Sequence, residues 1–318
     1  MTAANLRVRV RVPAKINLFL GVRGRRDDGY HDLVSVMQTI GVHDRLTASM
    51  SEVGGLHPTV RSRMSISLTH SDAVHLPCDS SNLAVRAAEA LLASLGGGGN
   101  GDHDDGPVTR LHLRKRIPIA GGMAGGSADA AAALVALNEL WDCGLDTAEL
   151  RRVAADLGAD VPFCVLGGTA LATGTGTQTA QVLCRTQAHW VVGINQEPLS
   201  TREVYAAWDE HCEPSQTEPD AVLTALGTGD LEALGAALHN DLEPAAFSLR
   251  PILEKQRDRL VTEGALGAVV SGSGPTVLGL APDQVNAQRL AAAVEDEFDR
   301  VLVASAPAGG PELLAELG

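Results

Sequence analysis

The chain begins with a segment in which apolar and charged residues alternate. Its positions are Leu6, Arg7, Val8, Arg9, Val10, Arg11 and Val12. A period of two is typical of a strand with one buried face, so we predict a strand here. A solvated strand face explains the three arginines better than a dedicated basic patch. The alternation resumes after Pro13 and continues to Leu20, and Asp28-Gly29 then predicts a turn.

The remaining hydrophobic pattern predicts a mixture of helices and strands. Helical periodicity predicts helices at 82–95, 129–140, 146–158, 201–210, 220–227, 230–240 and 283–298. Short apolar runs predict strands at 108–118, 166–173, 189–194 and 300–306, and a strand, glycine turn and strand at 264–282. Asp146 and Glu149 have the spacing of a capping box, and Gly158 suits the end of that helix. Because strand pairs and helices do not alternate regularly, we predict an α+β fold.

Length and composition are those of a globular protein with a sizeable core. The 318 residues suffice for two domains, and 45% hydrophobic with 20% charged residues is ordinary. The net charge of −14 disfavours nucleic acid and anionic membranes as main partners. It still permits a small anionic ligand, because local amides and a few cations can bind one.

Cysteine use and the N-terminal segment favour a cytoplasmic enzyme. The 5 cysteines are widely spaced and include no Cys-x-x-Cys pair, which argues against a disulfide framework or a zinc site. Arginines interrupt any signal-peptide core, and the apolar runs are far shorter than the roughly 20 residues of a membrane span. We expect a monomer or a weak homodimer.

The segment IAGGMAGGSADAAAALVALNEL, residues 119–140, joins a glycine-rich loop to a run of helix-forming residues. It is not a Walker A loop, because Ser127 stands where that motif has lysine. Nor is it the G-x-G-x-x-G fingerprint, because Met123 stands where the second glycine is required. Glycines nevertheless let the backbone approach a ligand, and the amides and dipole of a helix start favour an anion. The sequence therefore predicts an anion-binding loop, with a packing turn as the alternative.

Three other segments carry candidate chemistry. SGSGPT, residues 271–276, follows a predicted strand and could supply a second turn lined by amides. GADVP, residues 158–162, places Asp160 after a predicted helix and before an extended Val-Pro step, where an aspartate is usually a cap or turn residue. GGGGNGDHDDGP, residues 96–107, is interpreted as a flexible acidic insert rather than a metal site.

Together, several segments resemble the GHMP kinase superfamily, which includes galactokinase and the homoserine, mevalonate and phosphomevalonate kinases. They are the strand with Lys15, the glycine loop before a helix, and the later SGSG turn. PAKINLFLGVRGRRDDGYHDL (13–33) and GLDTAELRRVAADLGADVPF (144–163) are similar to the GHMP kinases that act on a diphosphocytidyl-methylerythritol. The resemblance implies a nucleotide-binding domain over 1–178, of the ribosomal-protein-S5-domain-2-like type. It also implies a ferredoxin-like substrate domain over 179–318, with the site in the cleft between the two.

The resemblance also assigns site residues. Lys15 and Asp160 match the family's catalytic lysine and aspartate. On the ATP side the matching residues are Lys115, Gly121, Gly122, Met123, Ala124, Gly125, Gly126 and Ser127. On the substrate side they are Asn17, Tyr30, His31, Thr201, Tyr205, Gly272, Ser273 and Gly274.

The implied reaction transfers the γ-phosphate of ATP to the 2-hydroxyl of a cytidine-diphosphate-linked sugar alcohol. Asp160 would take the hydroxyl proton or orient the hydroxyl, and Lys15 would keep Asp160 ionised. His31 would read the cytosine edge, with Tyr30 and Tyr205 packed near the base. Mg²⁺ would accompany ATP, without a dedicated protein metal site.

The sequence departs from the family pattern in two places. Thr177 stands where glutamate is common, and Met123-Ala124 stand where leucine and glycine are frequent. Two alternatives remain open: a GHMP kinase for mevalonate or homoserine, and a catalytically inactive nucleotide-binding regulator. The Tyr30-His31 pair argues against the first, because such kinases need no cytosine reader. Retention of both Lys15 and Asp160 argues against the second.

Overall fold

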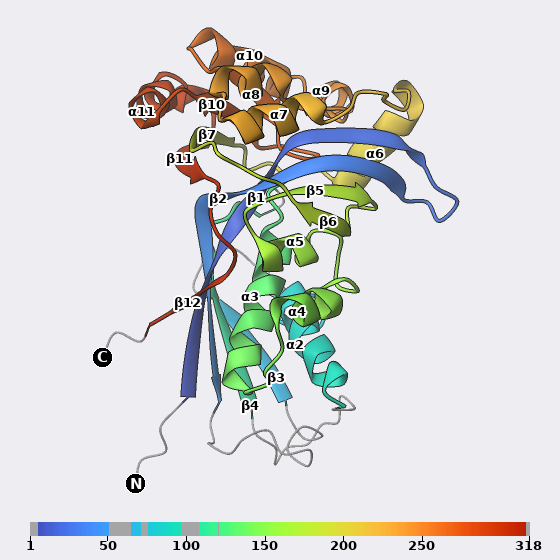
Figure 1. Ribbon diagram of the computed structural model, residues 1–318, viewed down its shortest axis with the longest axis vertical. Coiled ribbons are helices and arrows are strands. Elements are labelled where there is room, and N and C mark those ends of the chain that lie inside the picture. The colour runs from blue at the N-terminus through green and yellow to red at the C-terminus, as the bar shows by residue number, and fades with distance from the viewer. Residues whose placement is uncertain (1–5, 51–64, 71–75, 97–107, 120, 316–318) are drawn as a thin grey trace.

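The computed structural model describes residues 6–50, 65–70, 76–96, 108–119 and 121–315 (Figure 1). Helices and two largely antiparallel sheets make up an α+β fold, as the sequence predicts. The acidic insert predicted at 96–107 lies, apart from Gly96, outside the described residues.

The first sheet is built on two long strands, β1 (Leu6–Arg25) and β2 (His31–Met50), which pair antiparallel along their length. The predicted turn at Asp28-Gly29 joins them. The other strands of this sheet are β3 (Ser65–His70), β4 (Val108–Arg114), β5 (Thr169–Gly174), β6 (Gln178–Gln181), β8 (His239–Asn240) and β12 (Glu312–Leu314). Their main order is β12-β1-β2-β4-β3, with β5 beside β2, β6 beside β5 and β8 beside β1.

Helices of the first half cover one face of this sheet (Figure 1). They are α2 (Leu83–Ser94), α3 (Gly125–Leu140), α4 (Thr147–Ala154) and α5 (Val161–Leu166). Asn82 caps α2 by accepting from the Ala84 amide, and Asp146 with Glu149 forms the predicted capping box of α4. Alanines along α3 are fully buried, and their small side chains let the helix lie close to β1.

The chain around Asp160 differs from the prediction. The helix expected to reach Gly158 ends at Ala154, and the Val-Pro step expected to be extended begins α5 instead. Asp160 is the N-cap residue of α5, and Pro162 fits because the first helical turn needs no amide donor. Likewise β4 ends at Arg114, earlier than predicted, and α3 already begins at Gly125.

The second half forms an antiparallel sheet with helices around it. Its strands, in the order β11-β7-β10-β9, are β11 (Arg300–Ala306), β7 (Ala188–Ile194), β10 (Val277–Ala281) and β9 (Gly267–Val270). Its helices are α6 (Thr201–His211), α7 (Asp220–Thr228), α8 (Leu231–Ala237), α9 (Glu243–Leu249), α10 (Ile252–Thr262) and α11 (Gln284–Ala293), followed by a 3-10 turn at Glu295–Glu297. The division between residues 178 and 179 stays a prediction; β8 and β12, which lie beyond it in sequence, pair with β1.

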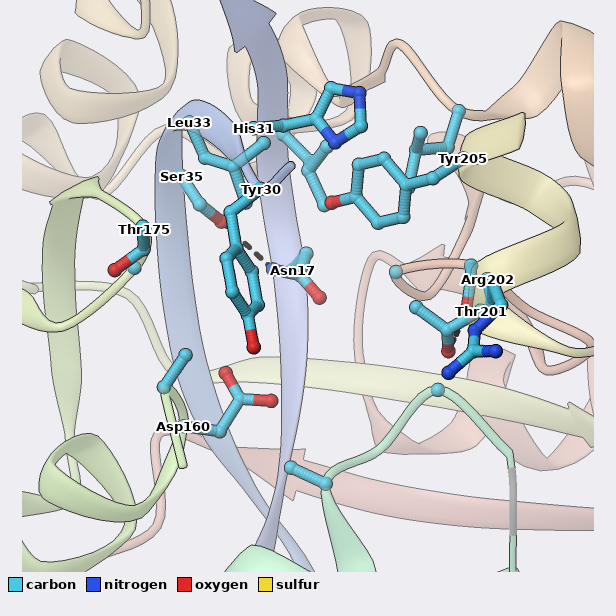
Figure 2. A pocket seen from close by; sticks show the side chains of 18 of the residues that line it. Asn17, Tyr30, His31, Leu33, Ser35, Asp160, Thr175, Thr201, Arg202 and Tyr205 are labelled. Carbon is cyan, nitrogen blue, oxygen red and sulfur yellow. Dashed lines mark hydrogen bonds between the residues drawn. The ribbon is translucent and has the colours of Figure 1, made fainter. Parts of the chain in front are cut away.

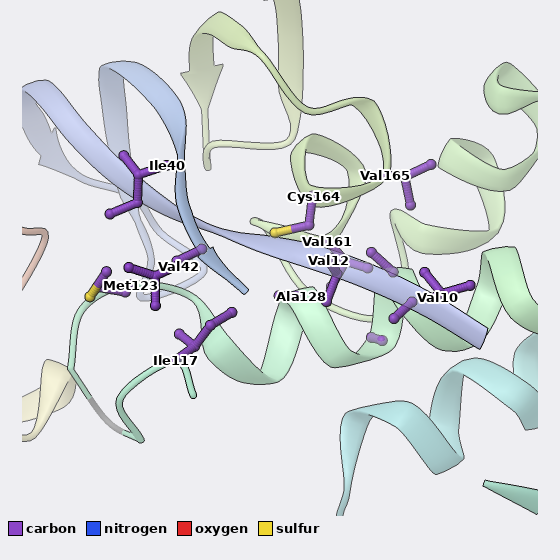
Figure 3. Packing of buried hydrophobic residues seen from close by; sticks show 14 of the residues in the cluster. Val10, Val12, Ile40, Val42, Ile117, Met123, Ala128, Val161, Cys164 and Val165 are labelled. Carbon is purple, nitrogen blue, oxygen red and sulfur yellow. The ribbon is translucent and has the colours of Figure 1, made fainter. Parts of the chain in front are cut away.

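The long strand β1 takes part in both hydrophobic cores. Val10 and Val12 pack near α3 and α5, within a cluster that Figure 3 shows in close-up. At the other end of β1, Leu20 and Val22 belong to a second cluster with the helices and sheet of the second half. Because both ends are anchored in packed cores, the residues in the middle of β1, including Lys15, are held in a fixed position.

Candidate active site

A cleft of about 1140 Å³ lies over the middle of β1. Segments from both halves of the chain line it, including the glycine loop, the start of α5, α6 and the 271–274 turn. The predicted site residues that line it are Lys15, Asn17, Tyr30, His31, Gly121, Gly122, Ala124, Gly125, Gly126, Ser127, Asp160, Thr201, Tyr205, Gly272 and Ser273. The fold therefore brings most of the predicted site together.

The glycine loop is held against the second glycine turn. Gly122 has a φ of +71°, and a Cβ added there would lie 2.1 Å from the Ser271 carbonyl oxygen. The Ser271 hydroxyl donates to the Gly122 carbonyl at 3.0 Å. Ala124, with a φ of 54°, precedes α3 without providing a side-chain cap. Gly125, Gly126 and Ser127 of the first helical turn face the cleft, where their amides can meet an anion.

Lys15 and Asp160 lie next to each other on the floor of the cleft. The Lys15 Nζ atom is 3.4 Å from the Asp160 Oδ2 atom, and their side chains are 8% and 34% exposed. The same Nζ donates to the Asn17 Oδ1 atom at 2.9 Å, and the Asn17 amide donates to the Ser35 hydroxyl at 2.8 Å. The ammonium is thus held by Asn17 of β1, which Ser35 of β2 holds in turn, while the carboxylate remains accessible from the cleft.

Aromatic rings form another wall of the cleft (Figure 2). His31 and Tyr205 stack with ring centroids 4.6 Å apart, and Trp208 meets His31 edge-on at 5.7 Å. The His31 Nε2 atom lies 2.7 Å from the Asp209 Oδ1 atom. Burial, together with the charge of Asp160, raises the pKa of the Tyr205 hydroxyl, so this group keeps its proton at neutral pH.

Two more predicted residues occupy the mouth of the cleft. The side chain of Tyr30 is largely exposed at 68%, and Figure 2 shows its ring reaching down toward Asp160. Thr201, at the start of α6, has its Oγ1 atom 2.8 Å from the Ser273 Oγ atom. That contact ties α6 to the second glycine turn.

The comparisons with known proteins agree on one family. Residues 82–168 match the model of the GHMP kinases N terminal domain, and residues 222–300 match that of the GHMP kinases C terminal domain. A 4-diphosphocytidyl-2-C-methyl-D-erythritol kinase of Salinispora tropica is 46% identical, covering 90% of this chain and 87% of its own. One of Pseudarthrobacter chlorophenolicus is 40% identical, covering 97% and 95%. The chain belongs to the 4-diphosphocytidyl-2-C-methyl-D-erythritol kinase family.

Solved structures place this kinase in the two-domain GHMP fold. A crystal structure of 4-(cytidine 5'-diphospho)-2C-methyl-D-erythritol kinase is 33% identical, with a TM-score of 0.74, and covers 95% of this chain and 100% of that chain. A homoserine kinase from Cytophaga hutchinsonii also has a TM-score of 0.74, with coverage of 97% of both chains. It is only 19% identical, so that likeness shows the fold alone.

The structure places Lys115 away from the cleft wall of this kinase. Its ammonium pairs with the buried carboxylates of Asp44 and Asp129, at 2.6 Å in the case of Asp129. Burial opposes its charge, but the two carboxylates more than offset this and raise the pKa of Lys115. Lys115 also donates to the Gly125 carbonyl at 3.3 Å and so braces the glycine loop. Its contact with ATP stays a prediction.

Met123 and Gly274 likewise do not line the cleft. Met123 is fully buried in the first core, and only its carbonyl reaches the site, where it accepts from the Lys15 amide at 3.2 Å. Gly274 faces Val270, at 3.0 Å from the position of an added Cβ. The residues next to them in sequence, Gly122, Ala124 and Ser273, line the cleft instead.

Several residues that the sequence did not single out belong to the site. Arg202 and Asp209 of α6 line the cleft, as do Ser35 and Thr175. Asn240 of β8 donates to the Val270 and Gly272 carbonyls at 2.8 Å and so fixes the second glycine turn. Asp209 follows Arg202 by seven residues, about two helical turns, so the two lie on nearby faces of α6. This spacing is the feature of the sequence that could have pointed to Asp209.

No group of three or more His, Cys, Asp or Glu side chains among the described residues could hold a metal ion. No helix within the described ranges is long and apolar enough to span a bilayer.

Proposed function

We propose that this kinase transfers the γ-phosphate of ATP to the 2-hydroxyl of 4-diphosphocytidyl-2-C-methyl-D-erythritol. The products would be the 2-phosphate and ADP, in the non-mevalonate route to isopentenyl diphosphate. The observation that carries the proposal is that one cleft holds the Lys15–Asp160 pair, the glycine loop and the His31–Tyr205 stack. The names of its relatives support the choice of acceptor.

We assign the binding of ATP, the phosphate donor, to the glycine loop. Amides of the Gly121–Ser127 segment open onto the cleft at the positive end of α3, which suits the triphosphate of ATP. Oxygen ligands suit Mg²⁺, which usually binds through phosphate oxygens and waters with few protein groups. The Ser127 hydroxyl and the Asp160 carboxylate line the cleft and could each supply it with a protein oxygen. When bound with ATP, Mg²⁺ would offset charge on the phosphates.

Proton transfer is assigned to Asp160. Its accessible carboxylate would take the proton of the acceptor hydroxyl as the oxygen bonds to the γ-phosphorus and the bond to the β-phosphate oxygen breaks. Lys15, 3.4 Å away, pairs with Asp160 and would offset charge that develops on the transferring group. Asn17 shares the Lys15 ammonium and is placed to orient the acceptor.

Base recognition is assigned to the aromatic wall. Tyr30 and Tyr205 offer ring faces to the cytosine, and His31 offers a ring nitrogen to its polar edge. Thr201, Gly272 and Ser273 supply hydroxyl and amide groups on the substrate side. We also infer a cytoplasmic location, in keeping with 5 widely spaced cysteines, and a monomer or weak homodimer.

The test determines which oxygen of the acceptor carries the transferred phosphate. The enzyme is incubated with Mg-ATP and the diphosphocytidyl acceptor, and phosphorus NMR locates the new ester. We expect one new phosphate on the 2-oxygen and stoichiometric ADP. An acceptor with uracil in place of cytosine is the matched control and should react far more slowly. ATP hydrolysis without a phosphorylated acceptor would refute the proposal.

A further inference from the structure

A second cavity, of about 230 Å³, shares no lining residue with the cleft. Its wall holds Arg11, Arg45, Arg114, Arg116 and Arg300, beside His43. These arginines come from β1, β2, β4, the segment after β4, and β11 of the other sheet. In a chain with a net charge of −14, such a concentration of positive charge calls for a physical reason.

Three of these arginines stand in one row across the first sheet. Arg11 pairs in register with Arg45, and Arg45 pairs in register with Arg114. Directly opposite residues in an antiparallel pair have Cβ atoms about 4.5–5.5 Å apart, and like charges there destabilise the sheet. The sheet therefore bears a repulsion that an anion seated between the guanidinium groups would remove.

Counter-charges within the described part of the chain are few. Glu312 of β12 pairs with Arg11, whereas Arg45, Arg114 and Arg300 have no carboxylate within 4.0 Å among the described residues. Arg116 has none there either. The Nε atom of Arg11 is buried and finds no hydrogen-bond partner in the same ranges.

The neighbouring imidazole of His43 adds little positive charge to the cavity. Burial first, and the charge of Arg11 second, lower the pKa of His43. The imidazole is therefore held neutral near neutral pH, and the guanidinium groups carry the charge of this cavity.

We propose that this cavity binds a small phosphate-type polyanion of the diphosphate class. Guanidinium groups bind phosphate oxygens through paired N–H donors, and a row of them requires a ligand with more than one charge. The volume lies below the roughly 300–1,000 Å³ of sites for drug-sized ligands, so it suits a diphosphate better than a whole nucleotide. Val42, Leu302 and Val303 form an apolar side of the cavity, which could contact a short hydrocarbon substituent.

The position of the cavity gives binding a structural consequence. Arg45 belongs to the first sheet and Arg300 to the second, so an anion held by both links the two halves that flank the cleft. The site is independent of the proposed kinase reaction and can be tested without acceptor.

The test measures binding of inorganic diphosphate by calorimetry, without Mg²⁺ and with saturating ADP so that the glycine loop of the cleft is occupied. The site variant is Arg45→Gln with Arg300→Gln. The matched control, Arg7→Gln with Arg110→Gln, removes the same charge from exposed arginines of the same sheet face that lie outside the cavity. We expect one diphosphate per wild-type chain and at least about tenfold weaker binding in the site variant, because charge-assisted hydrogen bonds are lost. The control variant should bind as the wild type does.

Thermal unfolding gives a second readout that a misfolded variant cannot mimic. Without anion, the site variant should unfold at a temperature equal to or above that of the wild type, because repulsion is relieved. With saturating diphosphate the order should reverse, since only the wild type gains from binding. Equal binding in wild type and site variant, an equal loss in the control, or no binding in the presence of ADP would overturn the proposal. If a short alkyl diphosphate binds more tightly than inorganic diphosphate, the ligand is a diphosphate ester. If the two bind equally, the ligand is the free anion. Both results support the site.

Discussion

The Nε2 atom of His31 lies 2.7 Å from the Oδ1 atom of Asp209, in a ring pair with Tyr205. A carboxylate only accepts hydrogen bonds, so this contact places a proton on Nε2. In the neutral ring, Nδ1 is then the acceptor. An amino group such as that of cytosine donates to an acceptor of this kind, whereas the carbonyl of uracil cannot. We infer that Asp209 positions the base-reading side chain.

The first prediction concerns Asp209. Asp209→Asn should raise KM for the diphosphocytidyl substrate about tenfold, the equivalent of one charge-assisted hydrogen bond. The value of kcat should change little, because Asp209 is not assigned to the reacting atoms. Steady-state kinetics check this, with the neighbouring exposed Glu210→Gln as control. A loss confined to kcat, or the same loss in both variants, would argue against a positioning role.

Asp160 carries the second prediction. Asp160→Asn should lower kcat at least about 10²-fold while ATP binding is retained, because an amide cannot accept the hydroxyl proton. The exposed Asp156→Asn, from the same segment of the chain, is the control and should keep full activity. Turnover assays paired with nucleotide titration separate the two effects. Full activity in Asp160→Asn would remove this residue from the proposed reaction.

The third prediction concerns the contact between the two glycine turns. Gly122→Ala should destabilise the protein by more than about 1 kcal/mol and weaken ATP binding, because φ is +71° and the new Cβ would meet the Ser271 carbonyl. In the control, Gly227→Ala in α7, no atom lies within 4 Å of the added Cβ. That change should stabilise by about 0.5–1 kcal/mol. Urea unfolding should therefore show opposite signs; the same sign for both would contradict the account.

The buried carboxylate Asp129 yields a pH prediction. Burial is the main cause that raises its pKa to about 7; Lys115 opposes the shift and Asp44 adds to it. Between its unfolded and folded pKa values the folded state binds more protons than the unfolded chain, so this contribution to stability falls as pH rises through about 4 to 7. Asp129→Asn should gain stability relative to wild type across that window. Urea unfolding at several pH values checks it, with Asp156→Asn giving a flat difference; a flat difference for Asp129→Asn as well would contradict it.

Elements with a complete local signal were predictable from the sequence. The alternation of β1, the capping box of Asp146 and the strand β11 at 300–306 are confirmed. Elements whose cause is non-local were not. The middle of β2 is buried at successive positions, so its sequence shows no alternation of apolar and polar residues. The helix α5 is too short to show a helical period. The local sequence predicts an extended Val161-Pro162 step, but these residues begin α5, which packs against α3.

The same distinction applies to the site. The glycine loop gave a physical signal of its own, but the link from Lys15 to Asp160 came through the family resemblance, since 145 residues separate them. The pairing of Lys115 with Asp44 was not expected, because the two residues lie 71 positions apart in sequence. Nothing local could have revealed that pairing, nor the one between His31 and Asp209.

The most direct test of the account compares kcat/KM for three acceptors under Mg-ATP: the diphosphocytidyl substrate, mevalonate and homoserine. ADP release is measured for each, with the Asp160→Asn variant as background. The account predicts turnover with the diphosphocytidyl substrate and background rates with the other two. Turnover with mevalonate or homoserine at an equal or higher kcat/KM, or none with the diphosphocytidyl substrate, would contradict it.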